Sequence, residues 1–312
     1  MARRSAPFSR SFRRAKAFLV VNLVLWAAIG GWYLFQPPAR QQEVSRLVGN
    51  LFNSRKQISA PEVAWDLWQL YYSTDYVHAP LPADRGQVYG GLPVASTGPL
   101  RVLANTGYTV GYSDALGDPL WAAYHLTDVD VKDSPPRPEE FSTDTRTVAR
   151  VETSVYNRSG YDRGHMAPNY AIATHYGKQA QTETFLMSNV TPQKHALNAG
   201  LWKTLEQKIA TNYPSRFGEI WVLAGPVFSA HPDRLKSRVA IPEAFYMIVL
   251  DESDGRVRAE AFLFPQDAAG TDLDRYLTTI DEVERRTGLD FLPALPDDAE
   301  NALEAKKAER AW

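Results

Sequence analysis

Two segments carry most of the chemistry visible in this chain: Tyr161-Asp162-Arg163-Gly164-His165-Met166-Ala167-Pro168 and Asn198-Ala199-Gly200-Leu201-Trp202-Lys203-Thr204-Leu205-Glu206. The first contains a histidine, whose pKa near neutrality suits a general base, beside an aspartate and an arginine. The second runs from an asparagine to a glutamate, and its apolar residues recur at helical spacing. Together the segments predict a site that combines a base, a metal ligand and a supporting acid.

Phosphodiester hydrolysis is a reaction that this combination suits, because it needs an activated water, a cation at the phosphate and help for the leaving oxygen. His165 is the candidate base. Arg163 can pair with a phosphate or with an acid inside the fold, and Asp162 can brace the loop or the imidazole ring. Gly164 has no side chain, which we expect to permit the close approach of a bulky polymer backbone.

Asn198 is the candidate metal ligand. A hard ion such as Mg²⁺ takes oxygen ligands and keeps several waters, so a single amide oxygen can be its only protein contact. The chain has no cysteine, which excludes thiolate zinc sites. Asn198 also stands where a helix N-cap belongs, and a cap is its alternative interpretation. Glu206 lies about 80° further round the same helix, so both residues can address one site.

The remaining pattern mixes strands and helices without regular alternation, which favours an α+β fold over a doubly wound sheet. The predicted strands are 101–103, 108–112, 120–127, 148–155, 220–224, 245–250 and 257–264. The predicted helices are 41–52, 61–72, 198–210 and 273–287.

The N-terminus predicts a membrane anchor. Residues 1–16 contain six basic residues and no acid, and residues 17–35 contain no charge. At about 1.5 Å per residue the uncharged run is as long as a bilayer core is thick, and it exceeds the apolar core of an ordinary signal peptide. The positive-inside rule then keeps the leader in the cytoplasm and places the rest on the extracytoplasmic, periplasmic side. Secretion after cleavage near Ala27-Ala28, and the mitochondrial inner membrane, are the alternatives.

The expected domains are therefore a basic cytoplasmic leader (1–16), a transmembrane signal anchor (17–35), a stalk or linker with short helices (36–95), a catalytic domain (96–296) and a charged peripheral tail (297–312). The formal net charge of −2 argues against nucleic-acid binding through the overall field of the protein. Residues 146–216, however, carry nine Lys and Arg against four Asp and Glu, so a local basic patch can supply phosphate contacts.

The two segments resemble the signature blocks of the DNA/RNA non-specific endonucleases of the ββα-metal superfamily, the group that includes mitochondrial endonuclease G. The resemblance is carried by Asp162-Arg163-Gly164-His165 with Ala167-Pro168, by Ser188-Asn189-Val190-Thr191-Pro192-Gln193, and by Asn198 through Glu206. It extends from about Leu100 to Leu292 and leaves residues 36–95 unexplained. It implies a ββα-metal nuclease fold with a central, mostly antiparallel sheet flanked by helices.

The resemblance also implies roles for single residues. It makes His165 the general base, Asn198 the direct Mg²⁺ ligand and Glu206 an acid that holds water coordinated to the metal. It gives Asn189 a supporting role, through the placement of water or of His165. The family's transition-state arginine corresponds to Arg137, and Arg146 is its rival because the spacing to the following aromatic residue varies.

By the same resemblance, the expected substrates are both DNA and RNA, cut with little base specificity, and the expected cofactor is Mg²⁺, with Mn²⁺ as the alternative. Homodimers occur in the family. Two other functions stay open: a phosphoesterase that uses the same histidine and metal on a smaller substrate, and a non-catalytic, membrane-anchored nucleic-acid-binding protein. The intact base, ligand and acid argue against the second, because a protein that only binds does not need a general base.

Overall fold

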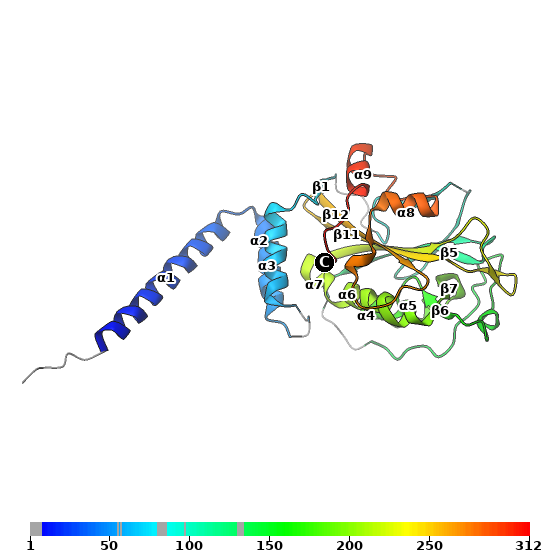
Figure 1. Cartoon of the computed structure of the whole chain (residues 1–312), viewed down its shortest axis with the longest axis horizontal. Helices are drawn as coiled ribbons and strands as arrows, with labels where there is room; N and C mark the ends of the chain where they lie inside the picture. The colour runs from blue at the N-terminus through cyan, green and yellow to red at the C-terminus, as the bar shows by residue number, and fades with distance from the viewer. Residues whose placement is uncertain (1–7, 55, 57, 80–85, 97, 130–133) are drawn as a thin grey trace, which may run out of the picture. The chain divides into compact units, whose positions relative to one another are not determined.

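The computed structural model describes residues 8–54, 56, 58–79, 86–96, 98–129 and 134–312 (Figure 1). By its contacts the chain divides into a small N-terminal unit, residues 1–46, and a large unit, residues 47–312. Residues 1–7 of the predicted basic leader lie outside the described residues.

The N-terminal unit is built on helix α1 (Phe8–Leu34) and the start of α2 (Pro38–Leu51). Between Phe12 and Leu34, an 18-residue window has a mean hydropathy of 1.8 and contains no residue that is buried inside the protein. At 1.5 Å per residue the 23 residues from Phe12 to Leu34 extend roughly 35 Å, enough to cross a bilayer by length and composition. The predicted apolar helix is therefore present, and it is a candidate membrane span.

The large unit is organised around one antiparallel sheet, as predicted. Its strand order is β1-β12-β11-β8-β5-β4-β3, with β13 paired to β12. These strands are β1 (Val77–His78), β3 (Arg101–Ala104), β4 (Thr109–Ser113), β5 (Asp118–Thr127), β8 (Glu219–Val227), β11 (Ala244–Ser253), β12 (Arg256–Pro265) and β13 (Leu277–Thr278). Three small two-stranded sheets pair β2 (Val94–Ala95) with β14 (Leu289–Asp290), β6 (Asp162–His165) with β7 (Val190–Gln193), and β9 (Arg234–Leu235) with β10 (Val239–Ala240).

Helices cover both faces of the central sheet (Figure 1). One face carries α4 (Asn169–Glu183), α5 (His195–Leu197), a π-helical turn (Asn198–Trp202), α6 (Lys203–Thr211) and α7 (Tyr213–Phe217); the other carries α8 (Ile280–Thr287) and α9 (Asp297–Glu304). Because side chains alternate along a strand, Val222 belongs to the core cluster that contains Trp202 of the first layer, and Leu223 belongs to the cluster that contains Val283 of α8. This layered arrangement matches the predicted α+β class.

Helix α3 (Ala60–Tyr72) belongs to the large unit. Ser59 and Glu62 form a capping box at its start, which satisfies two backbone N–H groups there. Asp66 accepts hydrogen bonds from both the Nε and Nη2 atoms of Arg216 at 2.8 and 2.6 Å, and both side chains are buried. Part of the segment expected to form a stalk is therefore held to the rest of the large unit by a bidentate ion pair.

Three local predictions were wrong. Residues 148–155 form no strand, because the backbone N–H groups of Val148 and Ala149 bind the Asp114 side chain and a 3-10 turn (Thr153–Tyr156) follows. The helix predicted from residue 273 begins only at Ile280, where the Thr279 hydroxyl caps it. The tail is not peripheral throughout, because it forms α9 and ends on Trp312, which is buried.

Candidate active site

The two sequence segments meet through a ββα arrangement. Strand β6 pairs antiparallel with β7, so that His165 lies opposite Val190, and the chain then enters the helical run that begins at His195. Gly164 is buried in this pair, and a Cβ atom at its position would lie 2.5 Å from Gln193 Oε1. The glycine is therefore required for packing between the two strands. The expectation that it permits the close approach of a polymer backbone was wrong.

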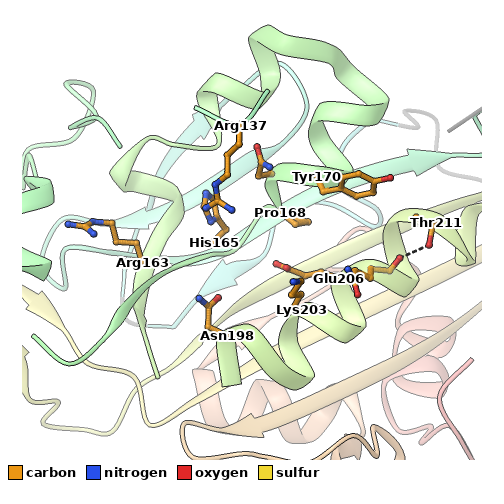
Figure 2. A pocket seen from close by; sticks show the side chains of 12 residues that line it. Arg137, Arg163, His165, Pro168, Tyr170, Asn198, Lys203, Glu206 and Thr211 are labelled. Atoms are coloured by element: carbon orange, nitrogen blue, oxygen red, sulfur yellow. Dashed lines mark hydrogen bonds between the residues drawn. The ribbon is translucent and has the colours of Figure 1, made fainter. Parts of the chain in front are cut away.

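A pocket of about 610 Å³ opens between the strand and the helix (Figure 2). Its lining includes five side chains from the sequence analysis: Arg137, Arg163, His165, Asn198 and Glu206. The remaining lining residues are Pro168, Asn169, Tyr170, Ala199, Lys203, Gln207 and Thr211. The fold thus brings a base, an amide oxygen, a carboxylate and two guanidinium groups to one cavity.

His165 is held as a neutral imidazole. Its ring packs against Phe141 and Phe185, with centroid separations of 5.2 and 5.1 Å. This burial, together with the charge of Arg137, lowers the pKa of His165 to about 3. Its Nε2 atom is buried and has no hydrogen-bond partner among the described residues. A neutral ring with an unused nitrogen can accept a proton, but a pKa of about 3 makes it a weak base. A bound phosphodiester is negatively charged and would raise this pKa toward the neutral range that suits a general base.

Asn189 fixes the backbone that follows His165. Its Oδ1 accepts from the Ala167 N–H at 2.8 Å, and its Nδ2 donates to the carbonyl oxygens of Ala167 and Thr184 at 2.9 and 3.0 Å. The side chain is fully buried and does not line the pocket. Asn189 therefore supports the site through the backbone and makes no hydrogen bond to the His165 ring.

Asn198 presents an oriented amide to the pocket. Its backbone torsions, φ −57° and ψ −46°, are helical, whereas an N-cap residue is normally extended. Its Nδ2 donates to Asp162 Oδ2 at 2.9 Å, and the same oxygen lies 2.8 Å from His195 Nδ1. An ionised carboxylate can only accept, so the amide nitrogen must face Asp162 and the oxygen Oδ1 is left toward the pocket. An oxygen donor held in this way fits a hard divalent cation.

Glu206, on α6, lines the same pocket as Asn198. Burial raises the pKa of Glu206 to about 8, against the opposing charges of Arg137 and Lys203. Burial disfavours the ionised form of the Glu206 carboxylate, and a bound cation would stabilise that form. The donor set of Asn198 and Glu206 is therefore compatible with Mg²⁺ or Mn²⁺, both of which prefer oxygen ligands.

The two arginines of the pocket, Arg137 and Arg163, differ in how many contacts their guanidinium groups make with the protein. Arg137 is exposed, and its guanidinium lies 5.2 Å from the centre of the Phe185 ring. Arg163 donates from Nη2 to the Thr153 carbonyl oxygen at 2.8 Å, and its guanidinium lies over the Tyr156 ring. Arg137 is therefore the more available of the two for an anionic substrate.

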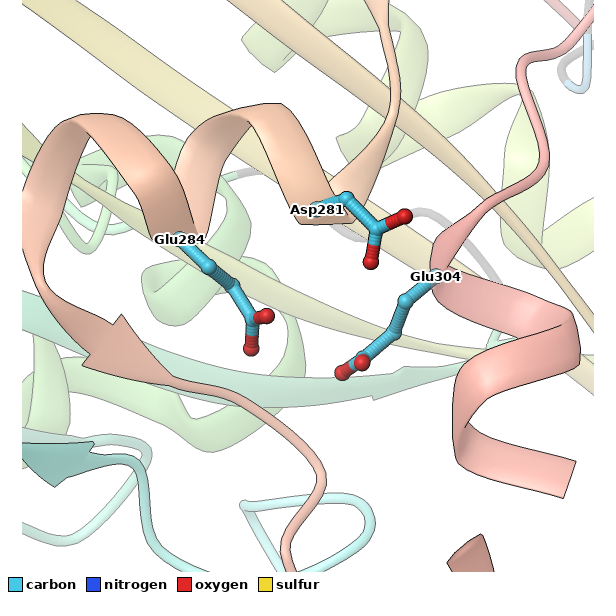
Figure 3. A group of neighbouring side chains, drawn as sticks. All are labelled: Asp281, Glu284 and Glu304. Carbon is cyan, nitrogen blue, oxygen red and sulfur yellow. The ribbon is translucent and has the colours of Figure 1, made fainter. Parts of the chain in front are cut away.

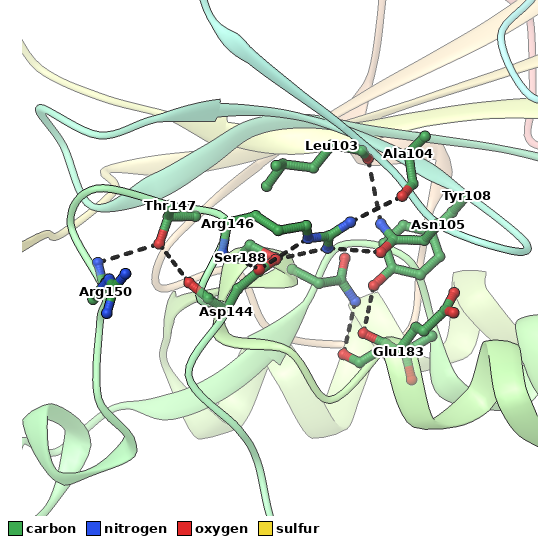
Figure 4. Close-up of polar contacts among 12 residues, drawn as sticks. Leu103, Ala104, Asn105, Tyr108, Asp144, Arg146, Thr147, Arg150, Glu183 and Ser188 are labelled. Carbon is green, nitrogen blue, oxygen red and sulfur yellow. Dashed lines mark hydrogen bonds and ion pairs between the residues drawn. The ribbon is translucent and has the colours of Figure 1, made fainter.

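Arg146, the rival of Arg137, lies in a different network (Figure 4). It donates to Asp144 Oδ2 at 2.7 Å, to Asn105 Oδ1 at 2.9 Å and to a backbone oxygen at 2.9 Å. Asp144 is buried and also accepts from the Ser188 hydroxyl at 2.6 Å. The structure therefore gives Arg146 a role in holding loops together and leaves it out of the pocket lining.

Asn169, Tyr170 and Lys203 line the pocket and His195 contacts Asp162, and none of these residues was singled out as a site residue. Lys203 could have been found from the helical pattern, because a polar side chain that points away from the apolar row must face either solvent or a functional site. The other three follow or precede the recognised motifs by a few residues, and only the tertiary contacts distinguish them.

Residues 93–298 match the family model described as DNA/RNA non-specific endonuclease. A nuclease of Nostoc sp. is 30% identical over 71% of this chain and 84% of its own length. The mitochondrial nuclease EXOG of Danio rerio is 29% identical over 61% of this chain, and this chain spans 60% of that relative. A crystal structure of EndoG with EndoGI superposes with a TM-score of 0.60 and 27% identity, covering 70% of this chain and 95% of that one.

Proposed function

Because the chain belongs to the DNA/RNA non-specific endonuclease family, we propose that it is a membrane-anchored, metal-dependent endonuclease that hydrolyses DNA and RNA without sequence preference. The observation that carries the proposal is the pocket in which His165, Asn198, Glu206 and Arg137 converge. No base-reading motif accompanies them, so recognition is expected to run through backbone phosphates.

The reaction can be assigned to groups of this chain. His165, neutral and with an unused Nε2, takes the proton of the attacking water. Arg137 and Lys203 carry positive charge at the pocket, which stabilises the charge that develops on the phosphate oxygens. Arg163 adds positive charge beside the base while its donors hold it to the protein.

Asn198 would hold Mg²⁺, or Mn²⁺, directly through its amide oxygen, and Glu206 would hold it through coordinated water, as the family resemblance implies. When bound, the ion neutralises negative charge on the phosphate and assists departure of the leaving oxygen. Asp162 orients Asn198, and Asn189 fixes the loop that carries the base. Asp162 thus acts as a positioning residue for Asn198, whereas the sequence predicted that it braces the loop or the imidazole ring.

The cellular arrangement is also a proposal. We assign residues 1–16 to a cytoplasmic leader, 17–35 to a signal anchor, 36–95 to a connecting segment, 96–296 to the nuclease domain and 297–312 to a C-terminal tail. The support is the uncharged part of α1, residues 17–34, which follows six basic residues within positions 1–16 and favours an extracytoplasmic catalytic domain. The names of the EXOG and endonuclease G relatives include the word mitochondrial, which keeps the inner membrane of that organelle as the alternative.

The full-length protein in detergent, incubated with supercoiled plasmid and with RNA, tests the function. We expect both to be cut in Mg²⁺ or Mn²⁺ and neither in excess chelator. Retention of both polymers without cleavage would favour a binding protein, and hydrolysis of only small phosphodiesters would favour a phosphoesterase. Light scattering on the same sample distinguishes a monomer from the homodimer that occurs in the family.

A further inference from the structure

A second group of acidic side chains lies on the face of the sheet opposite the pocket (Figures 1 and 3). Asp281 and Glu284 are three residues apart on α8, so they share one face of that helix. Glu304 is the last residue of α9. Each of the three offers one carboxylate oxygen, and these oxygens all lie within 4.8 Å of one another.

Among the residues that the structure describes, basic side chains do not neutralise this group. The two arginines of α8 are engaged elsewhere, Arg285 with Glu282 at 2.5 Å and Arg286 with Glu243 at 2.5 Å. Within the part of the chain that the structure describes, no ion pair joins Asp281, Glu284 or Glu304 to a lysine or arginine. Three carboxylates this close repel one another unless protons or a cation intervene.

Glu304 supplies an independent observation. Its side chain points into the group, only 5% of the residue is exposed, and its Oε1 has no hydrogen-bond partner among the described residues. Burial, followed by the charges of Glu284, Glu300, Asp281 and Asp290, raises the pKa of Glu304 to about 9. A buried carboxylate oxygen without a donor lacks the compensation that such groups normally have.

We propose that Asp281, Glu284 and Glu304 bind a Ca²⁺ ion that links α8 to α9. Ligand oxygens lie about 2.4 Å from a Ca²⁺ ion, so three carboxylate oxygens that lie within 4.8 Å of one another are close enough to share one ion. Ca²⁺ accepts several carboxylates and irregular geometry, whereas Mg²⁺ demands a near-ideal octahedron and usually keeps most of its waters. The C-terminal end of α9 also favours a cation, because the helix dipole is negative there.

This ion would have a structural role. Beyond α9 the chain continues to Trp312, which is buried against the guanidinium of Arg258 at 4.4 Å. A cation between α8 and α9 fixes the start of that C-terminal segment. Because the sheet separates this group from His165 and Asn198, the bound ion is expected to raise stability without contributing to hydrolysis.

Calcium binding can be measured directly by calorimetry on the full-length protein in detergent, after removal of ions with chelator. The Asn198→Ala background removes the amide ligand at the proposed catalytic site. We expect one Ca²⁺ per chain with a dissociation constant on the order of 10⁻⁴–10⁻³ M. Glu304→Gln should weaken binding by about tenfold or more, since it removes one of three charged ligands, while Glu309→Gln, at an exposed position of the same segment, should leave it unchanged.

Thermal unfolding gives a second readout. Without Ca²⁺, Glu304→Gln should unfold at or above the temperature of the unmodified protein, because it relieves repulsion. With about 10 mM Ca²⁺, the unmodified protein should gain roughly 2–4 °C and the variant should not. Equal binding or equal stabilisation in both proteins, or absence of binding at 10 mM, would show that the carboxylates share protons and would overturn the proposal. Binding of Mg²⁺ in preference to Ca²⁺ at these residues would overturn the assignment of the ion.

Discussion

The amide of Asn198 should lose its orientation when Asp162 is changed to asparagine. In the structure Asp162 Oδ2 accepts the Asn198 Nδ2 hydrogen bond at 2.9 Å, which directs the amide oxygen toward the pocket. In Asp162→Asn the new side chain can present an NH₂ group instead, and Asn198 can then rotate its oxygen toward that donor. The direct consequence is weaker binding of the divalent cation.

The size of this effect follows from the bond that is lost. A hydrogen bond to a charged group contributes about 1.5–3 kcal/mol, and each 1.4 kcal/mol corresponds to a tenfold change in an equilibrium constant. We therefore expect the Mg²⁺ concentration for half-maximal activity to rise by about 10- to 100-fold. Loss of a group that orients a metal ligand typically has an effect of the same size.

Plasmid nicking over a series of Mg²⁺ concentrations measures this midpoint, with thermal unfolding as the check on folding. His195→Ala is the matched control, because His195 contacts the same carboxylate but its side chain is 79% exposed. An exposed ion pair contributes about 0–1 kcal/mol, so the control should move the midpoint by less than about fivefold. An unchanged midpoint in Asp162→Asn would refute the orienting role of Asp162.

Five further outcomes are expected. His165→Gln should lower the cleavage rate by about 10²–10⁴-fold while nucleic-acid binding persists, and normal turnover would exclude His165 as the base. The pKa of His165 is lowered to about 3 in the folded protein, so as the pH falls below about 6.5 this histidine is protonated in the unfolded chain but not in the folded one. Between pH 7 and 5 the unmodified protein should therefore lose up to about 2 kcal/mol more stability than His165→Gln. Urea denaturation at the two pH values measures this difference. Asn198→Ala should reduce both activity and Mg²⁺ affinity; a loss of about 1 kcal/mol of stability with full activity would indicate a helix cap instead. Asp66→Ala should cost about 3–5 kcal/mol in denaturant unfolding, since it leaves Arg216 buried and unpaired, and a loss below 1 kcal/mol would contradict the contact. A reporter that is active only after export should function when fused after Trp312, whereas cytoplasmic activity would reverse the proposed orientation and a soluble form starting near residues 28–36 would indicate cleavage.

Local sequence patterns were sufficient for the class of fold, most strands and the identity of the family. Short apolar runs, several of them bounded by turn residues, identified β5, β8, β11 and β12, because a strand in a packed sheet must bury at least one face. The uncharged run near the N-terminus likewise followed from composition alone. The motif residues His165, Asn198 and Glu206 were candidates on chemical grounds before their positions in space were known.

Tertiary structure decided how those candidates are used. The sequence left Arg137 and Arg146 as rivals, and only the folded chain places Arg137 at the pocket and commits Arg146 to Asp144. The link from Asp162 to Asn198, and the acidic group that joins α8 to α9, each connect residues far apart along the chain. Hydrophobic periodicity indicates which side of a helix or strand is buried. It does not indicate which polar groups of one element meet those of another. Those pairings depend on the packing of the whole domain, and so they could be read only from the folded protein.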